Sequence, residues 1–196
     1  MTAFLVIRHG ATAWTEAGRL QGRADPALSA SGRAALAGRR VPAAFAGARW
    51  LTSPLRRARE TARLLGAPEA AIEACLIEMD WGAWEGRRLA EIRAELGPSM
   101  AANEARGLDF RPEGGESPRE VQARLAPLLG ELAGLAGPVI ALTHKGVIRA
   151  LLALATGWDM RNPPPARLAW DRGHAFTVAP GGGVTLEAPN LALDGR

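Results

Sequence analysis

The chain has 196 residues, of which 47% are hydrophobic and 22% are charged, a balance typical of one globular domain with a sizeable core. All but one of its 24 basic residues are arginine, the net charge is +4, and the pI is near 10.7. Because these arginines are scattered along the chain, the charge argues against a nucleic-acid partner and suits a small anionic substrate.

The first quarter of the chain predicts a strand, a loop, a helix and a second strand. Residues 3–7 are a continuous apolar run with β-branched and aromatic side chains, which predicts a buried strand over 3–8. The glycines, proline and polar residues of 11–30 predict a long loop. A capped helix is expected over 28–41 and a short strand over 48–54.

The next helix is predicted from its proline. Pro54 suits the first turn of a helix that is capped by Ser53 and ended by Gly66. Residues 70–82 contain a further strand and then a loop, and 85–96 reads as a helix ended by a Gly-Pro pair.

The remaining elements alternate in the same way. Residues 99–115 are expected to be helical at first and then to form a loop, and 117–137 repeats the Ser-Pro start of a helix. A strongly buried strand is predicted at 138–143 and a helix at 146–157. Residues 162–190 predict three short strands, with the glycine-rich 179–184 as a hairpin turn.

Strands that alternate with helices predict βαβ units and a mostly parallel sheet covered on both faces, in one domain over 1–196. No apolar stretch approaches the roughly 20 residues of a membrane span, and the run at 4–7 is too short for a secretory leader. With one cysteine, Cys75, no internal disulfide can form. We therefore expect a cytoplasmic protein without a membrane partner; the sequence makes no prediction of its oligomeric state.

Two histidines follow the two most apolar strands. His9 comes directly after 3–8 and His144 directly after 138–143, and a glycine lies close behind each. In open parallel sheets ligands bind just beyond the carboxyl ends of the strands. If the two strands are neighbours, both imidazoles face one crevice.

Arginine next to His9 favours an anion as the ligand. Arg8 carries a permanent charge and a guanidinium geometry that suits phosphate or carboxylate. The helix that begins near Pro54 offers further N–H groups and arginines. A metal site built from the histidines with Glu78 or Asp80 is less favourable, because guanidinium groups would crowd the cation.

Phosphoryl transfer is the chemistry that these residues suit. A neutral histidine nitrogen can attack phosphorus while cationic donors stabilise the equatorial oxygens. The reaction also needs an acid that protonates the departing alkoxide. Glu78 is a candidate for that acid, and on these arguments alone Asp80, Glu85 and Glu116 remain its rivals.

Six segments in order resemble the histidine phosphatase superfamily, also called phosphoglycerate mutase-like, over nearly the whole chain. They are LVIRHGATAW, GRLQGRADPALSASGR, TSPLRRARETA, LIEMDWGAWEGR, GGES and THKGVIRALL. The resemblance implies a three-layer α/β/α sandwich with a mostly parallel central sheet. It also implies a metal-independent phosphomonoesterase without an organic cofactor, acting on a small phosphorylated metabolite.

The resemblance assigns roles residue by residue. His9 would be the nucleophile that forms a phosphohistidine, and Glu78 would be the proton donor and acceptor. Arg8 and Arg57 would hold the phosphate. His144 would bind the phosphate and stabilise the transition state.

Five further residues are expected to contact substrate by the same resemblance: Thr12, Thr15, Gln21, Gly22 and Lys145. Two of them depart from the family pattern. Relatives often have asparagine in place of Thr15 and glycine in place of Lys145. Both departures bear on the choice of substrate more than on the core chemistry.

Two other functions are weighed against the phosphatase. A phosphoglycerate mutase of this family is usually longer, with segments that enclose the substrate, for which this chain has little room. A non-catalytic phosphate-binding or regulatory protein has no need of a placed general acid. Of the tryptophans, Trp14, Trp81 and Trp84 lie in elements near the expected site, whereas Trp170 is expected to serve packing.

Overall fold

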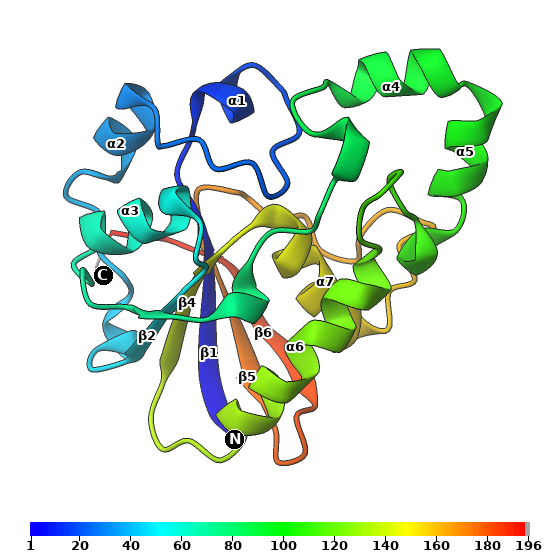
Figure 1. The fold of residues 1–196 in the computed structure, drawn as a ribbon. Helices are drawn as coiled ribbons and strands as arrows, with labels where there is room; N and C mark the ends of the chain where they lie inside the picture. The colour runs from blue at the N-terminus through cyan, green and yellow to red at the C-terminus, as the bar shows by residue number, and fades with distance from the viewer. Residues whose placement is uncertain (195–196) are drawn as a thin grey trace.

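The computed structural model describes residues 1–194, which form a six-stranded sheet with helices on both faces (Figure 1). The strand order is β3-β2-β4-β1-β5-β6. The strands are β1 Thr2–Arg8, β2 Arg49–Thr52, β3 Ala71–Ile72, β4 Val139–Thr143, β5 Gly173–Val178 and β6 Val184–Leu191. The pairings among β3, β2, β4 and β1 are parallel, and those of β5 with β1 and β6 are antiparallel.

Seven α-helices lie within the described residues. They are α1 Ala13–Glu16, α2 Ala30–Leu36, α3 Arg56–Leu64, α4 Leu89–Leu96, α5 Pro98–Glu104, α6 Pro118–Leu132 and α7 Lys145–Thr156. Short 3₁₀ turns lie at Ala43–Phe45, Ala74–Leu76, Gly82–Trp84 and Gly107–Asp109. None of the helices within 1–194 is long and apolar enough to cross a membrane.

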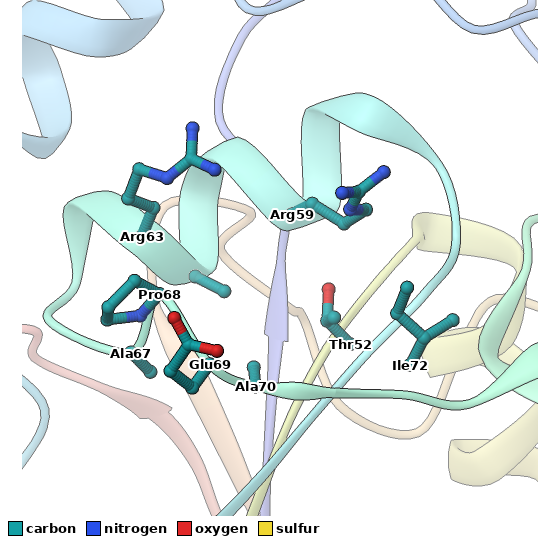
Figure 2. A pocket seen from close by; sticks show the side chains of 9 residues that line it. Thr52, Arg59, Arg63, Ala67, Pro68, Glu69, Ala70 and Ile72 are labelled. Carbon is teal, nitrogen blue, oxygen red and sulfur yellow. The ribbon is translucent and has the colours of Figure 1, made fainter.

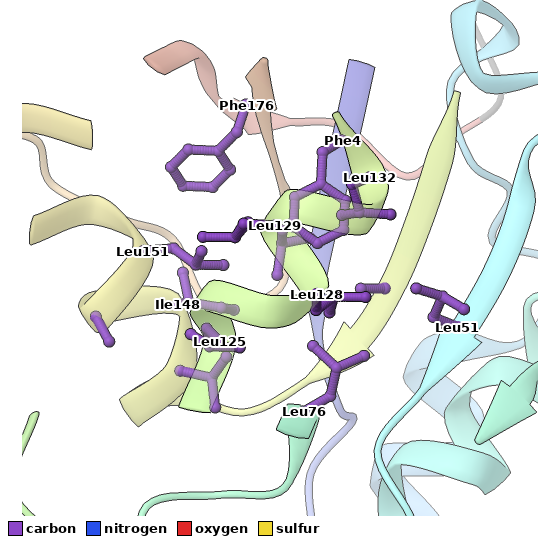
Figure 3. Close-up of a cluster of buried hydrophobic side chains, with 14 of the residues drawn as sticks. Phe4, Leu51, Leu76, Leu125, Leu128, Leu129, Leu132, Ile148, Leu151 and Phe176 are labelled. Atoms are coloured by element: carbon purple, nitrogen blue, oxygen red, sulfur yellow. The ribbon is translucent and has the colours of Figure 1, made fainter. Parts of the chain in front are cut away.

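The central strands β1 and β4 are mostly apolar because both of their faces are covered. Phe4 and Val6 of β1 pack with α6 and α7 in the larger core, which Figure 3 shows. Leu5 and Ile7 point to the opposite face and pack in a second core with Ala58 of α3. The α/β/α sandwich with a mostly parallel sheet is thus confirmed.

Three local predictions are wrong. The segment 11–30 is not all loop, because Thr12 and Thr15 form a reciprocal capping box around α1. The segment 162–190 contains two strands rather than three, and 179–183 is the turn between them.

The third error concerns the start of α3. The helix begins at Arg56 rather than at Pro54, and its N-cap is Leu55, which has no side-chain cap. Ser53 is therefore not the capping residue, because its hydroxyl is hydrogen-bonded to His144 instead.

Candidate active site

The two histidines meet at the carboxyl ends of neighbouring strands. β1 and β4 are parallel, with Arg8 opposite Thr143. One residue further on, the N–H of His9 donates to the carbonyl of Thr143 at 3.0 Å. The centroids of the His9 and His144 rings are 5.0 Å apart. Residues about 130 positions apart in sequence therefore share one site.

His9 is held as a neutral imidazole with one ring nitrogen free. Its Nδ1 lies 2.7 Å from the carbonyl oxygen of Gly10, which can only accept, so Nδ1 carries the proton and Nε2 presents a lone pair. Burial lowers the pKa of His9 well below its ordinary value, and the charges of Arg8 and Arg57 lower it further. The ring is therefore neutral at physiological pH.

Arg57 is the arginine of α3 that enters the site. It is fully buried and donates to the carbonyl oxygens of Ala24 at 2.7 Å and Gly22 at 2.8 Å. Arg56 turns outward to pair with Glu60. Arg59 lines a separate hollow of about 220 Å³ beside β3, which contains none of the expected site residues (Figure 2).

Buried donors without a protein partner gather around the histidines. Within residues 1–194, the only buried side-chain polar atoms with no hydrogen-bond partner are Nε of Arg8, Nε of Arg57, Nδ1 of His144 and Nε2 of His174. The first three belong to the expected site. Buried polar groups are seldom left unbonded, so three such groups in one place indicate a site that receives an acceptor-rich ligand.

Glu78 completes the site from the loop after β3. Its Oε1 accepts from the backbone N–H of Met79 at 2.8 Å and of Gly146 at 3.0 Å, and its Oε2 has no bond to any described residue. Burial raises the pKa of Glu78, although the Met79 N–H and the nearby guanidinium charges lower it. A Cβ at position 146 would lie 2.5 Å from Oε1, so the glycine there is needed for this carboxyl.

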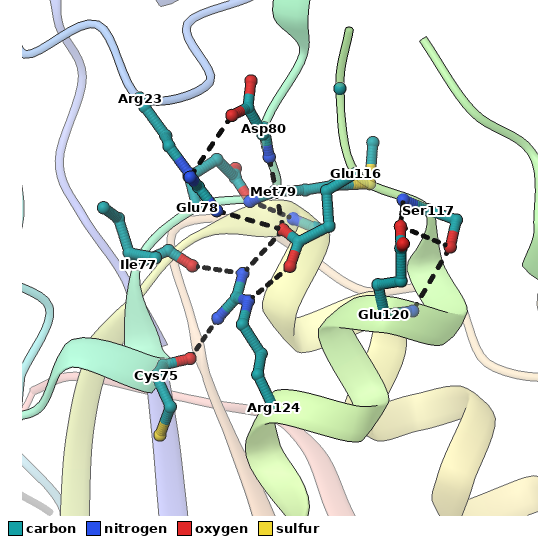
Figure 4. Close-up of polar contacts among 12 residues, drawn as sticks. Arg23, Cys75, Ile77, Glu78, Met79, Asp80, Glu116, Ser117, Glu120 and Arg124 are labelled. Carbon is teal, nitrogen blue, oxygen red and sulfur yellow. Dashed lines mark hydrogen bonds and ion pairs between the residues drawn. The ribbon is translucent and has the colours of Figure 1, made fainter.

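The three rival carboxylates are held by other partners, in contacts that Figure 4 draws for two of them. Asp80 pairs with Arg23 at 3.3 Å, and Glu116 pairs with Arg124 at 2.8 Å. Glu85 accepts from the backbone N–H groups of residues 23 and 24. Burial lowers the pKa of both Arg8 and Arg57, and of the four candidates only Glu78 opposes this at both by its charge, whereas Glu85 acts on Arg57 alone.

Arg124 of α6 also holds the segment that carries Glu78. Its guanidinium donates to the carbonyl oxygens of Cys75 and Ile77 while it pairs with Glu116 (Figure 4).

Burial raises the pKa of the Cys75 thiol to about 12, so this cysteine is protonated and is not a nucleophile.

The expected substrate contacts in the first loop mostly bond within the protein. The Thr12 hydroxyl donates to Oε1 of Gln21 at 2.6 Å, and the Thr15 hydroxyl donates to the carbonyl of Thr12 at 2.9 Å. Gly22 adopts φ +53°, and a Cβ there would overlap the Glu85 carboxylate. These residues shape the loop against Arg57, and Thr15 also lines the hollow beside His9.

Trp170 is a site neighbour that sequence reasoning assigned to packing. Its ring lies 5.7 Å from the guanidinium carbon of Arg8 and 5.2 Å from Nζ of Lys145. It also lines a hollow of about 250 Å³ that His9 and Arg8 border. No local motif marks it, but it comes three residues before Gly173, which pairs with Ile7 at the end of β1.

The donor set of the site suits an anion. Among residues 1–194, no group of three or more His, Cys, Asp or Glu side chains is arranged to hold a metal ion. The site instead contains two guanidinium groups and two imidazole rings with centroids 5.0 Å apart, and three of their buried nitrogen atoms have no partner in the described part of the chain. Such a set can bind a phosphoryl group and stabilise its charge.

Comparison with known proteins gives consistent matches. The glucosyl-3-phosphoglycerate phosphatase of Mycolicibacterium vanbaalenii is 35% identical over 175 residues, which cover 82% of this chain and 76% of the relative. The 2,3-bisphosphoglycerate-dependent phosphoglycerate mutase of Methylobacterium radiotolerans is 33% identical, with 84% of each chain covered.

Solved structures agree in fold. A mycobacterial glucosyl-3-phosphoglycerate phosphatase in complex with VO3 superposes with a TM-score of 0.80 at 27% identity, covering 98% of this chain and 100% of that one. The family described as histidine phosphatase superfamily (branch 1) matches residues 4–183. The chain therefore belongs to the histidine phosphatase superfamily.

Proposed function

We propose that this protein is a phosphomonoesterase that hydrolyses a small phosphate ester through a phosphohistidine on Nε2 of His9. The observation that carries the proposal is a set of three buried nitrogen atoms with no protein partner among the described residues, Nε of Arg8, Nε of Arg57 and Nδ1 of His144, beside a neutral imidazole. A phosphoryl group supplies the oxygens that these donors require. The phosphatase relatives support the same activity.

In this proposal each step of the reaction has its own group. Nε2 of His9 attacks phosphorus as the P–O bond to the alcohol breaks, and Glu78 gives its proton to the departing oxygen. Water then attacks the phosphohistidine while the Glu78 carboxylate takes a proton, and the P–N bond breaks to release inorganic phosphate. Arg8, Arg57 and His144 stabilise the equatorial oxygens in both steps.

Chelator resistance is the first test of this chemistry. Hydrolysis of an activated aryl phosphate at mildly acidic pH is expected to continue unchanged in excess chelator, because the guanidinium groups of Arg8 and Arg57 supply the positive charge that the phosphoryl group needs. The measurement is the release of phenol and of inorganic phosphate. Activity lost to the chelator would mean a metal site, and absence of turnover would favour a phosphate-binding protein.

The acceptor distinguishes a phosphatase from a mutase. With water as acceptor, inorganic phosphate is released in equal amount to the alcohol. A mutase would instead return the phosphoryl group to an organic hydroxyl, and the alcohol would exceed the phosphate.

Lys145 is the residue expected to select the class of phosphate ester that the enzyme binds. It begins α7 directly after His144, and its Nζ lies over Trp170, on the same ring that Arg8 contacts. No ion pair joins it to a described carboxylate. We propose that this cation favours esters that carry a second anionic group near the phosphate.

Replacing Lys145 tests that class. Lys145→Met is expected to raise KM about 5-fold for an ester with a nearby carboxylate, the scale of a partly exposed charge pair. KM for phenyl phosphate is expected to stay the same. Arg149→Met is the matched control, because Arg149 lies one turn further along α7 and stacks on Trp158 instead. An equal change in KM for both esters would contradict the assignment.

Two further predictions concern the substrate class of the enzyme and its location in the cell. A small phosphorylated metabolite as partner and a cytoplasmic location stay predictions from the sequence.

A further inference from the structure

Ser53 lies against His144 at the junction of β2 and α3. Both side chains are fully buried, and Oγ of Ser53 is 2.7 Å from Nε2 of His144. Ser53 follows β2 and His144 follows β4, so the two residues lie in different strand-to-helix connections, 91 positions apart in sequence. A helix cap, which the sequence predicts for Ser53, does not explain this contact.

The direction of the hydrogen bond follows from the other contacts of the hydroxyl. Oγ of Ser53 accepts from the backbone N–H of Leu55 at 3.3 Å. Its own proton has no acceptor among the described residues other than Nε2 of His144. A buried hydroxyl proton without an acceptor is costly, so Ser53 donates and Nε2 accepts.

The proton of a neutral His144 must then reside on Nδ1. Burial lowers the pKa of His144 well below its ordinary value, and the charges of its neighbours lower it further. The ring is therefore neutral and carries one proton. With Nε2 occupied as an acceptor, Nδ1–H becomes a buried donor, and it has no partner among the described residues.

We propose that Ser53 is a positioning residue that fixes the Nδ1–H tautomer of His144, so that this ring donates to the phosphoryl group. The proposal rests on the phosphatase function above. His9 and His144 both carry their proton on Nδ1, but a different hydrogen bond fixes this tautomer in each ring. A carbonyl on Nδ1 frees the lone pair of His9 for attack, whereas a hydroxyl donor on Nε2 frees the N–H of His144 for donation.

The other tautomer would oppose catalysis. It would place a lone pair of Nδ1, instead of an N–H, against a phosphoryl oxygen whose charge grows in the transition state. Loss of one such donor lowers the rate by roughly 100-fold or more. Ser53→Ala is therefore expected to lower kcat in proportion to the share of rings that lose the Nδ1–H form, about 5-fold for a mixture in which the Nε2–H form is the major one. KM is expected to change little.

The test reads the tautomers directly. The chain has three histidines, so long-range ¹H–¹⁵N spectra of the imidazoles at neutral pH can be assigned with single variants. His144 is expected as Nδ1–H. His174 is an internal reference with the opposite tautomer, because its Nδ1 faces the N–H of Asn190 at 3.3 Å and burial lowers its pKa to about 4.

Two variants complete the experiment. Ser53→Ala is expected to shift the His144 signals toward a mixture of tautomers, and Ser53→Thr, which keeps the hydroxyl, is expected to restore the wild-type spectrum and rate. Ser117→Ala is the matched control, because it removes another buried hydroxyl that caps α6 and does not contact either ring.

The outcomes separate the two proposals. A wild-type His144 in the Nε2–H form would overturn the role of Ser53, whether or not the variants fold. An unchanged tautomer and rate in Ser53→Ala would also overturn it. A protein with the expected spectrum but no hydrolysis of any phosphate ester would overturn the phosphatase function, and with it the catalytic role of Ser53.

Discussion

His9→Ala is expected to abolish hydrolysis of phosphate esters while the protein remains folded. Without Nε2 no covalent intermediate forms, and loss of a nucleophile lowers the rate on the order of 10⁴-fold or more. The strand does not depend on the ring, because β1 is held by its backbone pairing with β4 and β5. The midpoint of thermal unfolding should therefore change by no more than a few degrees.

The intermediate itself gives the decisive measurement. Wild-type enzyme mixed with an activated ester and quenched in alkali should carry one phosphoryl group, stable in base and labile in acid, on the peptide that contains His9. The variant should carry none. A label that persists in His9→Ala, or that maps to the His144 peptide, would contradict the assignment of His9 as nucleophile.

The arrangement of the two histidines shows which part of the site local sequence predicts. Each of β1 and β4 contains a continuous apolar run, and a histidine directly follows each strand, so both strand ends are visible in the sequence. The adjacency of β1 and β4 is not visible in the sequence, because it depends on a crossover of about 130 residues and on the pairing of the whole sheet. The sequence therefore predicts one crevice for both histidines only on the condition that β1 and β4 are neighbours, and the structure shows that they are.

Ser53 and Trp170 show what local rules miss. A serine before a proline predicts a helix cap, but the tertiary contact with His144 takes the hydroxyl and α3 begins later. Trp170 has no periodic pattern or motif around it. It reaches Arg8 because the antiparallel β5 starts where β1 ends, which the sequence alone does not reveal.

The sequence limits the candidates for the general acid to four carboxylates, and the family resemblance selects Glu78 among them. The structure adds the physical reason for that preference. Asp80 and Glu116 are each engaged by a guanidinium group, and Glu85 is held by the backbone N–H groups of residues 23 and 24. Glu78 is buried at the site, with one oxygen held and the other without a protein partner.

Glu78→Gln is expected to separate esters by their leaving groups. An alkyl alkoxide needs a proton as it departs, so kcat/KM for an alkyl phosphate should fall by about 10²- to 10⁴-fold. A dinitrophenolate departs without one, so kcat/KM for that ester should change little. Dephosphorylation still lacks its base, so the variant should release one equivalent of dinitrophenol in a burst and accumulate the phosphohistidine.

The pH profile follows from the same group. Glu78 acts as an acid only while protonated, and burial raises its pKa, so the acid form persists to higher pH than for an exposed glutamate. For an alkyl phosphate, kcat/KM should fall as pH rises through this raised pKa, and Glu78→Gln should remove that descending limb. The measurement is kcat/KM against pH for both esters.

Asp80→Asn supplies the matched control, because Asp80 lies two residues away and pairs with Arg23 rather than facing the histidines. It should leave the ratio of the two kcat/KM values as in the wild type. If Glu78→Gln slowed both esters equally, the carboxyl would be holding Gly146 and the start of α7 in place rather than transferring a proton. Only a leaving-group dependence that becomes steeper in Glu78→Gln and stays as in the wild type in Asp80→Asn identifies the acid, because a structural loss would not distinguish one alcohol from another.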